Sequence, residues 1–203
     1  MATLNQRISN GEFVDLRSLS GVFVDLRYGS EDNFLGRAVY PSGSPALLHR
    51  VAFERLSKSL KHLKAARPDL GFLIFDALRP RQAQWKLWNA VVNTPQQKYI
   101  GDPQRGSIHN FGFAIDLTLW SEPEGRELDM GTAFDHFSEL AEPQKEMEML
   151  AQGRLAEQHI QNRKTLRAAM EFGGFSGIPH EWWHFEALDR TRVREDYTII
   201  EEW

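Results

Sequence analysis

Four residues in two short stretches carry the side chains best suited to chemistry in this chain. His109 and Asp116 lie in Gly-Ser-Ile-His-Asn-Phe-Gly-Phe-Ala-Ile-Asp, and Glu181 and His184 lie in Pro-His-Glu-Trp-Trp-His. Two imidazoles and one carboxylate can hold a divalent metal ion and leave a coordination position open, as catalytic zinc sites do. A second carboxylate, from Glu181, could then act as a base on water bound to that ion. Together these parts describe a hydrolase.

Spacing alone leaves other interpretations open. A histidine and an aspartate seven positions apart occur by chance in many proteins. His180 could replace His184 as a ligand. Two histidines and one carboxylate also form the facial triad of non-haem iron oxygenases. In that case an arginine after His184 would bind a keto-acid co-substrate, and Glu181 would have no role. The arginines that follow are Arg190, Arg192 and Arg194.

Arg79 is a further candidate for catalysis. It follows the apolar run Phe-Leu-Ile-Phe and precedes Pro80, so we expect it to emerge where a strand ends. Peptide hydrolysis passes through a tetrahedral oxyanion, which a positioned guanidinium can stabilise by ~3 kcal/mol. The alternative is a surface arginine paired with Asp76.

Composition narrows both the ligands and the partners. The chain has 203 residues, 41% of them hydrophobic, which favours one domain over residues 1–203 with a sizeable core. It has 24 basic and 28 acidic residues, a net charge of −4 and no basic run, which argues against a nucleic-acid partner. There is no cysteine, so any metal must be held by His, Asp or Glu.

The sequence predicts neither export nor membrane insertion. The first ten residues lack the apolar core of a signal peptide. No apolar run approaches the ~18 residues that a membrane span needs. We therefore expect a cytoplasmic location.

Hydrophobic patterning predicts an α+β fold with a central, mainly antiparallel sheet flanked by helices, since strands and helices alternate without a regular βαβ rhythm. Pro179 disfavours a long helix around Glu181, which we place in a turn before the last strand. We expect strands near residues 22–27, 72–75, 114–119 and 183–188. We expect helices from Pro45, capped by Ser44, to Pro68, from Pro80 to Val92, and over 155–172. Residues 94–106 should form a loop.

The predicted strand 114–119 would position the first two metal ligands. Asp116 would project beside the small side chain of Ala114, which leaves room for a metal and a substrate. Gly112 would let the chain bend, so that His109 folds back to the same ion.

Five blocks of distinctive residues follow one another along the chain. They are Asp25-Leu26-Arg27-Tyr28 with Asp32-Asn33-Phe34, Phe75-Asp76-Ala77-Leu78-Arg79-Pro80, Ser107-x-His109-x-x-Gly112-x-Ala114-x-Asp116, Met130-Gly131-Thr132-Ala133-Phe134-Asp135, and Glu181-Trp182-Trp183-His184. In sequence and in order these blocks resemble the D-alanyl-D-alanine dipeptidases of the VanX type, zinc metallopeptidases related to D,D-carboxypeptidases and to the Hedgehog signalling domain. Asn110 and Phe111 fill variable positions of the third block, where they bear on pocket shape.

The resemblance implies a role for each matching residue. It implies one Zn²⁺ per chain, with a small dipeptide as substrate. The implied zinc ligands are His109, Asp116 and His184; Glu181 is the general base and acid, Arg79 stabilises the oxyanion, Asp135 meets the substrate ammonium with Tyr28, Ser107 lies in the substrate pocket, and Asp76 orients Arg79.

The sequence thus predicts a zinc dipeptidase that cleaves D-Ala-D-Ala or a similar D,D-dipeptide. Two alternatives remain at this stage. One is a D,D- or L,D-carboxypeptidase that acts on longer peptidoglycan peptides. The other is a non-catalytic zinc-bearing binding module, although a purely structural zinc needs neither Glu181 nor Arg79.

Overall fold

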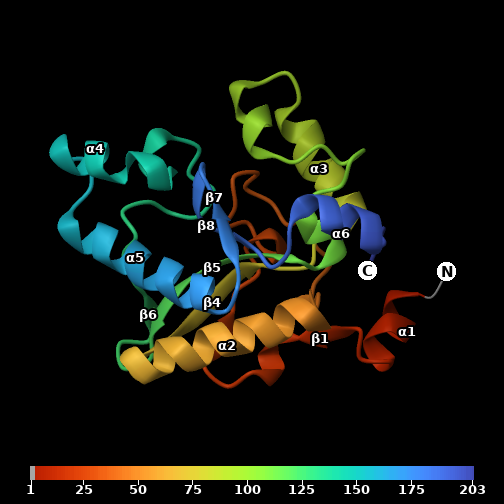
Figure 1. Cartoon of the computed structure of the whole chain (residues 1–203). Coiled ribbons are helices and arrows are strands. Elements are labelled where there is room, and N and C mark those ends of the chain that lie inside the picture. Colours follow the sequence, from red (N-terminus) through yellow and green to blue (C-terminus); the bar gives the residue numbers. More distant parts are fainter. Residues whose placement is uncertain (1–2) are drawn as a thin grey trace.

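The computed structural model, which describes residues 3–203, is built around a six-stranded sheet (Figure 1). Four of the strand pairings in this sheet are antiparallel. One is parallel, between the strands Val22–Val24 and Leu70–Asp76. The predicted α+β class with a mainly antiparallel sheet is confirmed. The order is β2 (Val22–Val24), β4 (Leu70–Asp76), β5 (Ala114–Ser121), β8 (Glu181–Glu186) and β7 (Ser176–Ile178), with β6 (Arg126–Glu127) paired to the end of β5.

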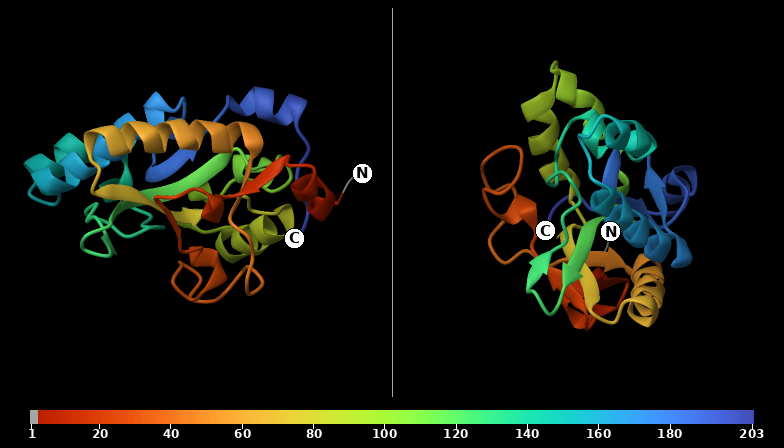
Figure 2. Two further views of the ribbon diagram at one scale, coloured as in Figure 1. Left: turned by 90° about the horizontal axis from the view of Figure 1, so that it is seen from below. Right: turned by 90° about the vertical axis from the view of Figure 1, so that its left-hand side faces the viewer.

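Two long helices cover one face of this sheet. They are α2 (Arg50–Ala66) and α5 (Glu157–Phe172), which pack against each other. Figure 2 shows the irregular segment that follows β2 on the opposite side of the sheet from α2. No helix in residues 3–203 is both long and apolar enough to cross a membrane. The remaining elements are α1 (Leu4–Ser9), α3 (Arg81–Val91), α4 (Glu146–Ala151), α6 (Arg190–Asp196) and the two-stranded sheet of β1 (Phe13–Asp15) and β3 (Leu47–His49).

The central strands are buried on both faces, which explains their composition. Every residue of β4 is buried, and its sequence Leu-Gly-Phe-Leu-Ile-Phe-Asp is almost wholly apolar. One face packs against α2, whose Leu56, Leu60 and Leu63 recur at helical spacing. The strand predicted at 72–75 is confirmed and is longer at both ends. Its last residue, Asp76, is the exception in composition and is fully buried.

The predicted start of the first long helix is wrong. The helix begins at Arg50 rather than Pro45, because residues 47–49 form β3 and pair with β1, with Phe13 opposite His49. The His49 ring caps the helix, since its Nδ1 accepts a hydrogen bond from the amide of Val51 (3.3 Å). Tertiary pairing therefore overrides the local Ser-Pro signal.

The other predicted elements agree more closely. The helices expected from Pro80 and over 155–172 begin at Arg81 and Glu157, and the strand expected over 114–119 is β5. The expected loop contains one short 3-10 helix, Pro95–Tyr99.

Glu181 was predicted in a turn, and this is wrong. It is the first residue of β8 and pairs with Ile178 of β7, where the register of the two strands shifts. The turn is confined to Pro179 and His180. The consequence is that Glu181 and His184 are held on one rigid strand.

The C-terminal segment fixes the start of α3. Pro80 offers no side-chain cap, and the first helical amides would otherwise lack partners. The amide of Arg81 donates to the carbonyl of Ile200 (2.8 Å), and that of Gln82 donates to Glu201 (2.9 Å). The amide of Ile200 in turn donates to the carbonyl of Asn110 (2.8 Å). Segments far apart in sequence are thus tied together beside Arg79.

Replacing Gly112 by alanine should destabilise the fold at this junction. Gly112 has φ +75°, and a Cβ there would lie 2.6 Å from Cε1 of Phe13 and 3.0 Å from the amide nitrogen of His49. We expect Gly112→Ala to lower the free energy of unfolding by ~3 kcal/mol, from backbone strain plus overpacking. Denaturant titration measures this loss.

The matched control is Gly43→Ala. Gly43 has nearly the same φ, +77°, but no atom lies within 4 Å of the position that its Cβ would take. It should lose only the backbone contribution, ~1 kcal/mol. Equal losses for the two variants would show that close packing at Gly112 is unimportant.

Candidate active site

Three neighbouring strands bring three polar side chains into one row across the sheet. Asp76 of β4 is the Cα partner of Asp116 of β5, and Asp116 is the partner of His184 of β8. Directly opposed residues of a sheet project from the same face, so these side chains are neighbours. A register shift between Ile74 and Asp76 marks an irregularity in β4 at this point, and such bulges redirect side chains next to functional sites.

His109 reaches the same place from a short 3-10 helix, η4 (Ile108–Phe111). Its ring Nδ1–H donates to the carbonyl of Ala77 (2.7 Å), and its own carbonyl accepts from the amide of Arg79 (3.1 Å). Gly112, in the left-handed region, ends η4 and turns the chain into β5. The segment after β4 and η4 therefore hold each other in place.

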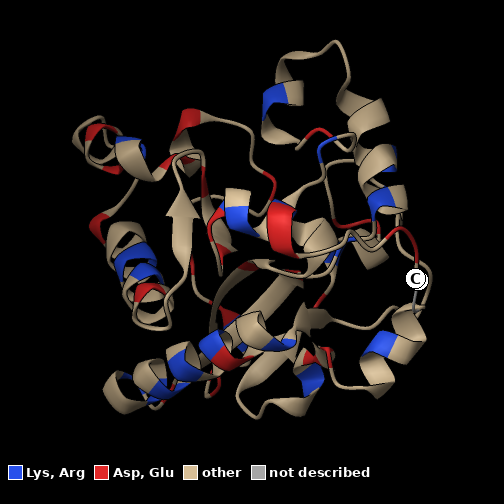
Figure 3. Cartoon of the chain, turned by 45° about the vertical axis from the view of Figure 1, so that its right-hand side comes forward, with Lys and Arg blue, Asp and Glu red and all other residues tan. Residues whose placement is uncertain are grey.

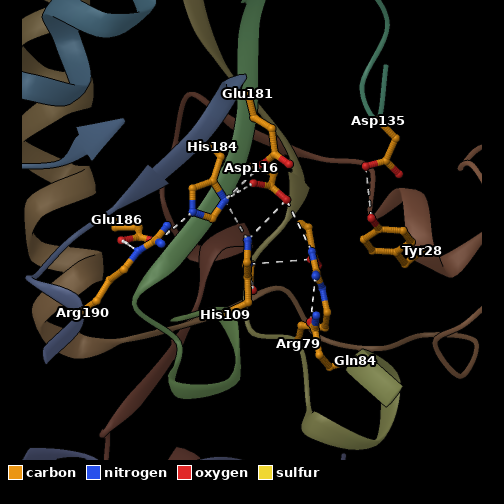
Figure 4. Close-up of polar contacts among 12 residues, drawn as sticks. Tyr28, Arg79, Gln84, His109, Asp116, Asp135, Glu181, His184, Glu186 and Arg190 are labelled. Carbon is orange, nitrogen blue, oxygen red and sulfur yellow. Dashed lines mark hydrogen bonds and ion pairs between the residues drawn. The ribbon is translucent and has the colours of Figure 1, made fainter. Parts of the chain in front are cut away.

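The ligand atoms of His109, Asp116 and His184 converge (Figure 4), and all lie within 4.8 Å of one another. His184 Nδ1 lies 2.9 Å from Asp116 Oδ1 and 3.2 Å from His109 Nε2, and His109 Nε2 lies 3.4 Å from Asp116 Oδ2. Tetrahedral coordination with bonds of ~2.1 Å separates ligand atoms by about 3.4 Å. The spacing therefore suits a small tetrahedral cation.

The hydrogen bonds of the two rings direct their lone pairs toward that cation. His109 donates through Nδ1 to Ala77, and His184 donates through Nε2 to Glu186 Oε1 (3.1 Å). Glu186 is held in turn by Arg190, whose Nη2 lies 2.7 Å from Oε1. The remaining ring nitrogens face each other and, when both are unprotonated, repel as two lone pairs. A shared positive charge removes this repulsion, and such outer hydrogen bonds are typical of metal-binding histidines.

The electrostatics of the cluster point the same way. Burial raises the pKa of Asp116, but the charges and hydrogen bonds of His109 and His184 outweigh it and lower that pKa. Burial lowers the pKa of His184, yet the hydrogen bonds that its ring donates to Asp116 and Glu186 raise it to about 10. The carboxylates around the rings thus favour an added positive charge at this position.

Arg79 lies against the same carboxylates. Its Nε donates to Asp76 Oδ2 (2.8 Å), its Nη1 donates to Gln84 Oε1 (2.9 Å), and its Nη2 lies 3.6 Å from Asp116 Oδ2. Tyr40 donates its hydroxyl to the other oxygen of Asp76 (2.6 Å). Burial lowers the pKa of Arg79, but the neighbouring negative charge of Asp76 prevails and raises it well above its ordinary value. The guanidinium is therefore charged and fixed in orientation.

Glu181 approaches the cluster from the edge of β8. One carboxylate oxygen lies 3.9 Å from Nδ1 of His184, without a closer partner among the residues that the structure describes. Burial raises the pKa of Glu181 to about 7, while the charge of His184 opposes this shift. A carboxylate with such a pKa can both accept and return a proton near neutral pH.

Asp135 lies across from Glu181, on the loop after β6 (Figure 4). It has φ +58°, a conformation that aspartate tolerates better than most residues. Its Oδ1 accepts from the hydroxyl of Tyr28 (3.1 Å), whereas its Oδ2 is buried without a partner in residues 3–203. Burial raises the pKa of Asp135. An uncompensated buried carboxylate of this kind is suited to a cationic ligand.

A buried arginine of α5 positions this loop. Arg163 is fully buried and donates through Nε to the carbonyl of Met130 (2.8 Å) and through Nη2 to that of Leu140 (2.9 Å). The indole of Trp182 donates to the hydroxyl of Thr132 (2.7 Å). The loop that carries Asp135 is therefore anchored on both α5 and β8.

The clustered ligand residues, Arg79, Glu181 and Asp135 line one cleft of about 710 Å³. Asp76 does not line it and lies behind Arg79, which it contacts directly. His180 does line it but is exposed, and the converging cluster contains His184 instead. The predicted residues that line the cleft are Tyr28, Arg79, Ser107, His109, Asp116, Asp135, Glu181 and His184.

The two variable positions of the third sequence block, Asn110 and Phe111, do not shape the cleft, contrary to expectation. Asn110 and Phe111 are both buried and are absent from its walls. Asn110 donates to the carbonyl of Arg79 (2.7 Å) and accepts from the amide of Ser107 (2.7 Å). Its role is to join two segments that line the cleft.

Several supporting residues were missed from the sequence. Glu186 could have been found, since it lies two positions after His184 on a predicted strand and so shares its face. Gln84, Tyr40 and Arg163 carry no local signal, because their partners lie elsewhere in the chain or across a helix start.

Comparison with known proteins assigns the family. The model of a family described as D-ala-D-ala dipeptidase, Peptidase_M15, matches residues 9–201. The chain belongs to this family. It is 40% identical over 176 residues to the D-alanyl-D-alanine dipeptidase of Escherichia coli, covering 86% of this chain and 84% of that protein. Proteins of the same name from Enterococcus faecalis (29% over 188 residues; 84% and 88%) and Enterococcus faecium (30% over 187 residues; 83% and 87%) are also similar.

Membership in this family confirms the predicted peptidase and excludes two of the open interpretations. The chain is an enzyme, so the non-catalytic module is excluded, and the iron oxygenase is excluded with it. The His109, Asp116 and His184 cluster remains a candidate metal centre on its geometry.

Loss of one clustered histidine should abolish metal binding. We expect His109→Ala to purify with far less bound metal than the wild type, because two remaining ligands hold a divalent ion weakly. His180→Ala, a histidine on the rim of the same cleft, should keep its full content. Elemental analysis measures both. Full metal in His109→Ala, or loss in His180→Ala, would move the site.

Proposed function

We propose that the enzyme hydrolyses D-alanyl-D-alanine or a similar D,D-dipeptide with the help of one bound Zn²⁺. The observation that carries this proposal is the convergence of His109, Asp116 and His184 in a cleft that also holds an unpaired buried carboxylate. The names of the related proteins support the substrate, since each is a D-alanyl-D-alanine dipeptidase.

The donor set fits zinc in type and number. Two imidazole nitrogens and one carboxylate oxygen are ordinary zinc ligands, and three of them leave a position open for catalysis. A zinc ion held there would polarise the scissile carbonyl and lower the pKa of a coordinated water toward ~7.

Glu181 is the proton carrier in this proposal. Its carboxylate lies 3.9 Å from His184 Nδ1, beside the ligand atoms and facing the cleft. It would accept a proton from the attacking water and return it to the leaving amine. The pKa near 7 that burial gives this carboxyl suits both transfers.

Arg79 would stabilise the oxyanion that forms on the scissile carbonyl. The guanidinium faces the cleft, while Asp76 and Gln84 hold its Nε and Nη1 from behind. Because these contacts fix its orientation before substrate binds, no reorganisation is needed as charge develops.

Asp135 and Tyr28 would bind the substrate ammonium. The free oxygen of Asp135 is buried, so a cationic group is the partner that would relieve its desolvation. The hydroxyl of Tyr28 orients the other oxygen. Ser107 lines the same cleft and is placed to contact the substrate.

This ammonium site argues against the carboxypeptidase alternative. A longer peptide would place an uncharged amide against Asp135, whose buried carboxylate would then lack a cation. We therefore expect D-Ala-D-Ala to be cleaved at least ~100-fold faster, in kcat/KM, than a pentapeptide that ends in D-Ala-D-Ala. Comparable rates on the two substrates, measured by release of D-alanine, would favour the carboxypeptidase.

Glu181→Gln separates proton transfer from metal binding. The substitution keeps the shape of the side chain but removes the base, so kcat should fall ~1,000-fold while bound zinc is unchanged. Glu195→Gln is the control, since Glu195 is an exposed residue of α6. Turnover within tenfold of the wild type would contradict the role of Glu181, and loss of zinc would make it a ligand.

A further inference from the structure

One wall of the cleft is basic. Lys98, Arg105 and Arg194 line it, and none of them forms an ion pair among residues 3–203. Two come from the segment between α3 and β5, and the third comes from α6. Figure 3 shows basic positions on both of these parts of the chain, on the same side of the molecule. Unpaired cations facing a shared cleft indicate an anionic ligand.

Arg194 is the best-placed of these cations. It is half-buried, and its Nη2 donates to the carbonyl of Gly106 (3.2 Å). Its Nε is buried and has no acceptor in the part of the chain that the structure describes. Burial lowers the pKa of Arg194, and the positive charge of Arg105 lowers it further. The two guanidinium groups therefore repel each other, and the charges of Glu186 and Asp189 offset this repulsion only in part.

The carboxylates nearby are already engaged. Asp102 accepts from the amide of Gln104 (2.8 Å). Asp189 caps α6 and accepts from the amides of Thr191 (2.9 Å) and Arg192 (3.2 Å). Neither of these carboxylates forms an ion pair with Arg105 or Arg194 in residues 3–203.

Glu186, the third acid on this wall, is also occupied. It accepts hydrogen bonds from His184 and from both Nε and Nη2 of Arg190. An anion that approaches Arg194 therefore has no protein carboxylate to displace.

Arg105 and Arg194 line the same cleft as the candidate metal ligands, so the anion is expected to be part of the substrate. Gly106, which Arg194 contacts, is followed by Ser107 on the cleft wall and by His109 three residues later. Three residues span at most ~10 Å, which is within reach of a small substrate. The anionic Asp135 lines the cleft as well. A cleft with one buried anion and a separate cationic wall complements a short zwitterion.

We propose that Arg194, assisted by Arg105, binds the C-terminal carboxylate of the dipeptide. This inference rests on the proposed function and adds a requirement for a free C-terminus. A guanidinium can bind a carboxylate through two parallel hydrogen bonds, and Nε is one of its usual donors. A substrate without that charge would leave Arg194 unpaired, and such sites reject neutral analogues strongly.

The test compares D-alanyl-D-alanine with D-alanyl-D-alaninamide, which has the same scissile bond and no terminal charge. The wild type should prefer the free acid by ~100-fold or more in kcat/KM. Arg194→Gln should raise KM for the free acid ~30-fold with kcat nearly unchanged. The kcat/KM of Arg194→Gln for the amide should equal that of the wild type, so the preference of the variant for the free acid becomes smaller. Arg105→Gln should act in the same direction and more weakly.

Arg192→Gln is the matched control. Arg192 is an exposed residue of the same helix, pairs with Asp196 and lies outside the cleft. It should keep the wild-type preference. Arg194→Lys, which retains the charge, should recover part of the lost preference and guards against a folding defect in Arg194→Gln.

The outcomes separate the two proposals. A wild type that cleaves neither compound contradicts the proposed dipeptidase function itself. A wild type that cleaves both equally well, or an Arg194→Gln enzyme with the wild-type preference, overturns only the carboxylate site. Equal losses on the acid and the amide would also overturn it, because they would indicate a structural role for Arg194.

Discussion

The burial of several charged groups at one row of the sheet is the constraint on which the rest of this structure depends. Asp76, Asp116 and His184 are opposed on three adjacent strands, and each is less than a tenth exposed. An ionised group in the interior costs several kcal/mol unless it is paired. The surrounding contacts provide those pairs, with Arg79 between Asp76 and Asp116 and with His109 beside Asp116. Strand register, the turn at η4 and the hydrogen bonds of Ile200 and Glu201 beside α3 all maintain this arrangement.

Negative charge is in excess around this row. The carboxylates of Asp76, Asp116, Asp135, Glu181 and Glu186 are balanced only in part by the guanidinium groups of Arg79 and Arg190 and by the imidazole of His184. A divalent cation and a substrate ammonium would together offset the difference. The raised pKa values of Glu181 and Asp135 follow first from burial and then from this excess, because nearby Asp116 disfavours ionisation of both. Metal, substrate and proton carrier are thus linked through one electrostatic balance.

Whether a feature of the fold or of the site could be predicted from the sequence depends on how far apart along the chain the interacting residues lie. Alternation over 114–119 predicted the strand that carries Asp116, and the distinctive side chains of His109 and His184 marked the candidate metal ligands. The start of α2 and the strand position of Glu181 were misjudged, since pairing with β1 and β7 decides them and leaves no local trace. The support that Arg163 gives to the Asp135 loop comes from 33 residues away, so no local pattern could indicate it.

The decisive experiment is to titrate metal-free protein with zinc while the hydrolysis of D-alanyl-D-alanine is followed. The central claim is that the cluster of His109, Asp116 and His184 holds the ion on which turnover depends. Activity should be absent after chelation, rise linearly with added zinc and reach its maximum at one zinc per chain. Full hydrolysis by the metal-free protein, or a zinc dependence that does not saturate near one equivalent, would contradict the claim.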